Sequence, residues 1–248
     1  MQQGLDEAGL SYTRDYLPTD ELLFIDTSFL SVCSGQRNLE YRDTRRYTNL
    51  RISRIRNLAD AFEKRNNIRT IPEVLLEIDV SLSCLAGRKK KIKAINQKNY
   101  GRTSAPPVPR QDKLKQELKY LKRIYEILEA RVINSIEDPE LYNHVQGILP
   151  FVRDIHKREG GSSNEFETDE KLVSTTLYYA QVRPSGVCSC DVGLMKAYAS
   201  CVRELPISFP DPIVCDGIHG MVFSANDYRT HEKKHNSNPD KSLRGIYK

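Results

Sequence analysis

The sequence lacks the features of membrane and secreted proteins. Its 248 residues contain no apolar run of about 18 residues, the length that a membrane-spanning helix requires. The first ten residues, MQQGLDEAGL, have no basic stretch followed by an apolar core, so they do not indicate a signal peptide. We therefore expect a cytoplasmic protein with no membrane partner.

Zinc-ligand patterns are also missing. Among the six cysteines only Cys188 and Cys190 lie close together, as C-x-C, without a second pair at zinc-ligand spacing. His231 and His235 stand four residues apart in HEKKH, but a single such pair in a polar segment does not define a site. The cysteines are expected to be reduced and mostly buried.

The composition is that of a globular and mildly basic protein. Apolar residues make up 39% of the chain and charged residues 29%, with a net charge of +5 and a pI of about 8.8. The length suits one large domain or two small ones. The positive balance points to an anionic partner without identifying it.

Short apolar strands alternate with helical patterns along the chain. Strands are expected at LLFI (22–25), RTI (69–71), GVCSC (186–190) and PISF (206–209). The expected helices cover residues 50–62, 72–78, 112–133, 143–157, 169–181 and 192–205. This alternation predicts an α/β fold with a mostly parallel sheet.

The α/β pattern occupies residues 20–209, between a leader arm (1–19) and a polar C-terminal extension (210–248). Residues 86–111 interrupt it with a basic insertion that has seven basic and no acidic residues between positions 88 and 102. The prolines that follow at 106, 107 and 109 block a helix, so we expect a mobile insertion. The apolar stripe of the next helix, 112–133, predicts packing on the core, with a partner-binding coiled coil as the alternative.

Acidic residues stand where the ligand crevice of a parallel sheet would form. Asp26 ends the strand LLFI and Asp191 follows the strand VCSC, while Asp169 opens a helix. Glu77 lies on the helix PEVLLEI, where Glu73 is a rival one turn earlier. Because the carboxyl ends of parallel strands share one edge, these acids are expected to converge there.

A divalent cation would resolve the repulsion among these carboxylates. Mg²⁺ takes carboxylate oxygens while keeping several waters, and it can orient a water for attack on a phosphodiester. Each acid also has a purely structural interpretation: a lone Asp is a common turn former or helix cap, and Asp169 suits the first turn of a helix. For Glu77 the alternative is a solvent-facing position on its helix.

Four short segments resemble, in chain order, the four acidic motifs of the PIN-domain ribonucleases. They are LFIDTSFL, IPEVLLEID, TDEKLVSTTLYYA and SCDVGLMKAYA. The resemblance covers residues 20–85 and 112–209. Cys190 occupies a place where the family often has a second acid. The residues that match the motifs are Asp26, Thr27, Ser28, Glu77, Thr168, Asp169, Ser189 and Asp191.

The resemblance implies a PIN-like three-layer α/β/α sandwich and a metal-dependent endoribonuclease. Asp26, Glu77, Asp169 and Asp191 would be the catalytic and metal-binding residues for Mg²⁺ or Mn²⁺, supported by Thr27, Ser28, Thr168 and Ser189. The substrate would be single-stranded RNA. Because the family includes toxins of toxin–antitoxin pairs, a protein inhibitor or antitoxin is an open partner, as is a homodimer.

Basic residues must attract the polyanion that an acidic pocket repels, and such contacts make binding salt-dependent. The candidate RNA-binding residues are Arg45, Arg46, Arg88, Lys89, Lys90, Lys91 and Lys93. Tyrosines interleaved with arginines at 41–47 suit base stacking, although a solvated surface is the plain alternative.

Two other functions remain open. A PIN-like scaffold could bind RNA or protein without cutting. A phosphohydrolase of the haloacid dehalogenase type would use Asp26 as nucleophile, but it expects a second Asp where Ser28 stands.

Overall fold

The computed structural model describes residues 17–31, 44–98, 111–161, 167–217 and 221–228, apart from the side chains at 31, 44–51, 54, 88–98 and 111–114. The predicted leader arm falls almost entirely outside this description. So do residues 99–110, which belong to the predicted insertion, and 229–248 of the predicted extension.

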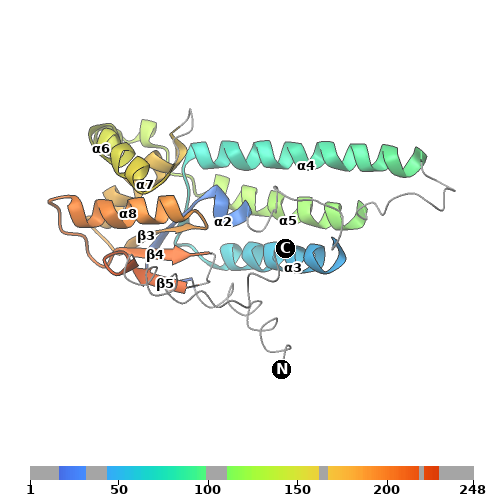
Figure 1. Ribbon diagram of the computed structural model, residues 1–248, viewed down its shortest axis with the longest axis horizontal. Coiled ribbons are helices and arrows are strands. Elements are labelled where there is room, and N and C mark those ends of the chain that lie inside the picture. Colours follow the sequence, from blue (N-terminus) through green and yellow to red (C-terminus); the bar gives the residue numbers. More distant parts are fainter. Residues whose placement is uncertain (1–16, 32–43, 99–110, 162–166, 218–220, 229–248) are drawn as a thin grey trace, which may run out of the picture.

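A five-stranded sheet forms the centre of the fold, and it confirms the predicted α/β class (Figure 1). The strand order is β2-β1-β3-β4-β5; the first four strands are parallel and β5 runs antiparallel to β4. The strands are β1 (Leu22–Ile25), β2 (Ile68–Arg69), β3 (Ser185–Ser189), β4 (Ile213–Asp216) and β5 (Met221–Ser224).

The central strands are buried along their whole length. All four residues of β1 and all five of β3 are buried, as expected for parallel strands covered on both faces. Gly186 of β3 allows close approach to β4, because a Cβ there would collide with the main chain of Ile213. The continuous apolar run LLFI is thus a core strand, as the sequence predicts.

Short connections lead from these strands into helices at one edge of the sheet. Helix α2 (Thr27–Ser31) follows β1, and α8 (Val192–Glu204) follows β3. Helix α7 (Thr168–Ala180) precedes β3 and contacts α6 (Pro139–Arg158), which begins after the short 3₁₀ helix η1 (Ser135–Glu137). None of the described helices is long and apolar enough to cross a membrane.

Three long helices extend away from the sheet as an arm (Figure 1). They are α3 (Thr44–Lys64), α4 (Pro72–Lys98) and α5 (Gln111–Glu129). Helix α5 contacts both α3 and α4, and its apolar residues Leu121, Ile124 and Leu128 are buried. The stripe of α5 therefore packs inside this chain, as predicted, and the described structure gives no need for a coiled-coil partner.

Three sequence predictions about the elements are wrong. Residues 86–98 belong to α4 and are not part of a mobile insertion, because the lysines, alanine and glutamine there are good helix formers. PISF (206–209), which lies within the described residues, forms no strand. The last strands, β4 and β5, lie instead within the segment predicted to be a polar extension, where IVCD and MVFS are short apolar runs between polar residues.

Candidate functional site

Asp26 and Asp191 lie at the same edge of the sheet because their strands are parallel neighbours. Ile25 of β1 pairs with Cys188 of β3, and the Asp26 amide continues the ladder by donating to the Cys188 carbonyl at 3.0 Å. Asp191 follows two residues after β3 ends. The structure thus brings these two predicted site residues to one edge, as strand direction requires.

Serine side chains fix the Asp26 carboxylate, which is only 3% exposed. Its Oδ2 accepts from the Ser28 amide at 3.1 Å, from the Ser189 hydroxyl at 2.8 Å and from the Ser28 hydroxyl. The Ser189 hydroxyl also accepts from the Asp191 amide at 2.8 Å. Ser28 and Ser189, the predicted supporting residues, therefore tie the turn after β1 to the turn after β3.

Burial raises the pKa of Asp26 above its ordinary value of 3.8. The hydrogen bonds from Ser28 and Ser189 oppose that effect because they favour the ionised carboxylate, and the negative charge of Glu77 adds to it. Asp26 and Glu77, far apart in the sequence, therefore interact electrostatically.

Asp169 is a second acid of the site whose pKa is raised. Burial raises its pKa from 3.8 to about 8, and the negative charges of Asp26 and Asp191 contribute to that rise, whereas His156 opposes the shift. Asp169 lies in the first turn of α7, so it reaches the site from a third element. The three predicted aspartates, brought by β1, α7 and α8, therefore share one electrostatic environment.

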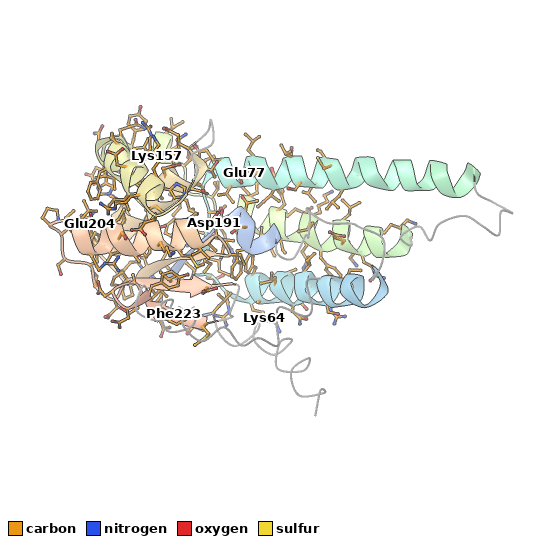
Figure 2. All side chains as sticks on the ribbon, in the orientation of Figure 1. Lys64, Glu77, Lys157, Asp191, Glu204 and Phe223 are labelled. Atoms are coloured by element: carbon orange, nitrogen blue, oxygen red, sulfur yellow. The ribbon has the colours of Figure 1, made fainter. Side chains whose placement is uncertain are left out.

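The hydrogen bonds distinguish the two glutamates of α4. Glu77 Oε2 accepts from the Thr27 hydroxyl at 2.6 Å, next to Asp26. Glu73 Oε1 instead pairs with Lys171 Nζ at 2.9 Å. Figure 2 labels Glu77 and Asp191 where the arm meets the sheet. Glu77, the residue predicted from the sequence, is thus the glutamate that adjoins the aspartates.

Asp191 also caps a helix, which is the structural role given above as the alternative to metal binding. It is the N-cap of α8: its Oδ1 accepts from the Gly193 amide at 2.7 Å and from the Leu194 amide at 3.2 Å. The cap orients the carboxylate at the rim of the site. A capping role and a ligand role are compatible, because a carboxylate has a second oxygen.

His156 and Glu170 also belong to the site, although neither is predicted from the sequence. His156, on α6, is 1% exposed, and its Nδ1 lies 2.9 Å from Oε1 of the fully buried Glu170. Its Nε2 lies 3.7 Å from Asp169 Oδ2. A signal existed: His156 continues the apolar stripe of Val145, Leu149 and Val152, so its side chain had to point inward.

The surroundings determine the protonation of His156. Burial opposes a charge on its ring, but the hydrogen bond with Glu170 and the charges of Asp169, Glu170 and Asp191 outweigh burial and raise its pKa above 6.5. A buried imidazole surrounded by carboxylates compensates part of their negative charge.

The structure says less about the contacts of the other residues named from the sequence. Thr168 is buried at the start of α7. Cys190, which departs from the family's motif, is half-buried beside Gly217. The side chains of the predicted RNA-binding residues lie outside the described structure, although their main chains belong to α3 and α4. These are Arg45, Arg46, Arg88, Lys89, Lys90, Lys91 and Lys93.

Within the described part of the chain, no group of three or more His, Cys, Asp or Glu side chains is arranged to hold a metal ion. The acids thus share one region without forming a closed coordination shell. One oxygen each of Asp26 and Asp191 already accepts protein hydrogen bonds. A cation bound by these two residues would therefore use their other oxygens or displace these hydrogen bonds.

Comparisons of the chain with protein-family models, with curated proteins and with solved structures find no match. The resemblance to PIN-domain ribonucleases therefore depends on the four short motifs and on the arrangement of the residues in them.

Proposed function

We propose that this chain is a metal-dependent endoribonuclease that hydrolyses phosphodiester bonds of single-stranded RNA. The observation that supports this function best is the clustering of three aspartates. The Ser189 hydroxyl bonds both the Asp26 carboxylate and the Asp191 amide, and the charges of these two acids help to raise the pKa of Asp169. The mostly parallel sheet with its helices is compatible with a PIN-like three-layer sandwich.

The donor set suits Mg²⁺ or Mn²⁺. Asp26, Glu77, Asp169 and Asp191 offer carboxylate oxygens, the ligand type that hard divalent ions prefer. A cation among them would offset the repulsion that now contributes to the raised pKa of Asp169. When bound, such an ion activates water and stabilises the charge that develops on a phosphodiester.

The protein's own groups would prepare the carboxylates for this task. Ser28 and Ser189 hold Oδ2 of Asp26, so its carboxylate is oriented before a ligand arrives. Thr27 does the same for Glu77. Such preorganisation reduces the reorganisation needed when charge develops in the reaction.

RNA as substrate follows from the motif resemblance and from the charge of α4. The helix has its Glu77 turn near the acidic site and extends outward along the arm (Figures 1 and 2). Six of its last eleven positions, 88–98, are Lys or Arg. An RNA strand that leaves the acidic site could therefore follow a basic helix, with phosphate contacts providing affinity.

One observation favours a second candidate, a non-catalytic RNA- or protein-binding scaffold. Among the described side chains, no three or more His, Cys, Asp or Glu residues are arranged to hold a metal ion. A binding protein that needs no catalytic ion would show the same arrangement. The scaffold predicts RNA binding that is unchanged by Mn²⁺ and by removal of the acids.

Cleavage of a labelled single-stranded RNA in the presence of Mn²⁺ distinguishes the two functions. We expect Asp26→Asn, Asp169→Asn and Asp191→Asn each to lower the rate about a hundredfold or more, as losing one electrostatic group at a reacting centre does. Asp138→Asn is the matched control, because Asp138 is also a helix N-cap, at the start of α6. Equal cleavage by the wild type and Asp26→Asn would reject the nuclease.

A further inference from the structure

The proposed function assigns no role to Nε2, a buried ring nitrogen of His156. The residue is 1% exposed, and its Nε2 has no hydrogen-bond partner among the described residues. Leaving a buried polar atom unsatisfied costs about 1–3 kcal/mol, so such an atom calls for an explanation, and a bound water or ion is one. This nitrogen lies near Asp169, one of the clustered acids.

Glu170 determines which nitrogen of His156 can bind a ligand. Its carboxylate lies 2.9 Å from Nδ1, so an ionised Glu170 accepts a hydrogen bond from a protonated Nδ1. In the neutral ring Nε2 then carries the lone pair. Metal-binding histidines almost always donate their other ring N–H to a carboxylate, a carbonyl or water in this way.

The separation of Nε2 from Asp169 Oδ2, 3.7 Å, is too long for a direct hydrogen bond. It does suit two atoms that share an ion. Ligand atoms at about 2.1 Å from one cation lie at most about 4.2 Å apart. The pair could therefore hold a cation between them with little movement of the ring.

The main chain at Gly161 lies against the His156 ring. A Cβ at this position would overlap three atoms of the imidazole, Nε2, Cδ2 and Cε1, so the glycine passes over the face of the ring. The lone pair of Nε2 lies in the ring plane and points elsewhere. The glycine thus restrains the ring from one face, outside the plane in which Nε2 would bind a ligand.

We propose that His156 Nε2 is a nitrogen ligand of the divalent cation, oriented by Glu170, and that it makes the site prefer Mn²⁺ over Mg²⁺. This inference rests on the proposed function, since Asp26, Asp169 and Asp191 would supply the other ligands. Imidazole nitrogen suits transition metals, whereas Mg²⁺ favours oxygen ligands. An ion that binds at Nε2 displaces any proton there.

Pulsed electron paramagnetic resonance of the full chain with Mn²⁺ tests the nitrogen ligand without any substitution. We expect hyperfine coupling from one ¹⁴N nucleus, replaced by ¹⁵N coupling when histidine is labelled. Calorimetric titrations with Mn²⁺ and Mg²⁺ give the second readout. His156→Gln should weaken Mn²⁺ binding at least about tenfold and Mg²⁺ binding much less.

His144→Gln is the matched control. His144 also lies on α6 and also has a buried Nε2 without a hydrogen-bond partner in the described part of the chain, but its ring packs on Tyr178. This substitution should leave both the coupling and the Mn²⁺ affinity unchanged. Coupling that disappears in His144→Gln but persists in His156→Gln would overturn the assignment.

The outcomes separate this inference from the proposed function. Mn²⁺ that binds the wild type, depends on Asp169 and shows no nitrogen coupling would overturn the histidine ligand and leave the nuclease standing. A wild type that binds no Mn²⁺ at all would overturn both. If His156→Gln does not fold, a labelled wild-type spectrum without nitrogen coupling still overturns the assignment, and coupling that persists in His144→Gln supports it.

Discussion

Replacing Asp169 by asparagine should stabilise the cation-free protein, and the gain should grow with pH. The folded state raises the pKa of Asp169 from 3.8 to about 8, so between these values it binds a proton that the unfolded chain releases. The wild type therefore loses stability as pH rises from about 4 to about 8, and it loses no more from this group above that range. The asparagine side chain of the variant carries no charge and has no such dependence.

The size of the gain follows from the displacement of the pKa. Each unit is worth about 1.4 kcal/mol, so a displacement from 3.8 to about 8 corresponds to about 6 kcal/mol at most. The Asp169 side chain remains 26% exposed, so solvent screens part of this effect. We therefore expect about 2 kcal/mol in the free energy of unfolding at pH 8.

Urea unfolding with a chelator, at pH 5 and pH 8, measures this effect. Asp138→Asn is again the control, because Asn and Asp are about equal as helix caps and no change is expected. Adding Mn²⁺ should reverse the order, stabilising the wild type by about 2.7 kcal/mol at a hundredfold excess over Kd. The reasoning is refuted if Asp169→Asn lowers stability, or shifts it equally at both pH values.

Three further substitutions test other contacts. Ser189→Ala removes a donor to Asp26 and leaves Asp26 less satisfied, so urea unfolding should show a loss of about 1–3 kcal/mol; no loss would mean the contact is dispensable. Alanine at residues 89–91 should weaken RNA binding and reduce the slope of log K against log salt by about 2, and an unchanged slope would assign these lysines to solubility. Gly161→Ala should displace the His156 ring and weaken Mn²⁺ binding in calorimetry; unchanged affinity would mean the ring position is unimportant.

The site could be anticipated where local pattern and strand direction agree. LLFI had to be a buried strand, and the polar residue after it had to lie at the carboxyl edge. The same reasoning located Asp191, whose capping of α8 was an explicit alternative. Ser28 and Ser189 were assigned supporting roles by the motifs, and both contact Asp26.

The remaining contacts of the site depend on packing between segments that are distant in the sequence. The hydrophobic periodicity of the sequence does not reveal such packing. The sequence favoured Glu77 over its rival Glu73, but only their partners, Thr27 and Lys171, distinguish the two. His156 appears in the sequence as one polar residue in an apolar stripe. Its pairing with Glu170 becomes visible only in the tertiary structure.

The end of α4 and the last two strands were predicted wrongly for a different reason. A basic run was taken to mark a loop, yet lysine favours helix, and α4 continues to Lys98. The short strands β4 and β5 carry few apolar residues, so a polar context hid them. Charge and polarity describe solvent exposure, and they are poor guides to secondary structure.

Anomalous scattering from a crystal grown with Mn²⁺ tests most directly whether the converging acids share an ion. We predict a peak within about 2.1 Å of carboxylate oxygens from Asp26, Asp169 and Asp191. A crystal with no peak among these side chains, at a concentration of Mn²⁺ that supports cleavage, would contradict the account.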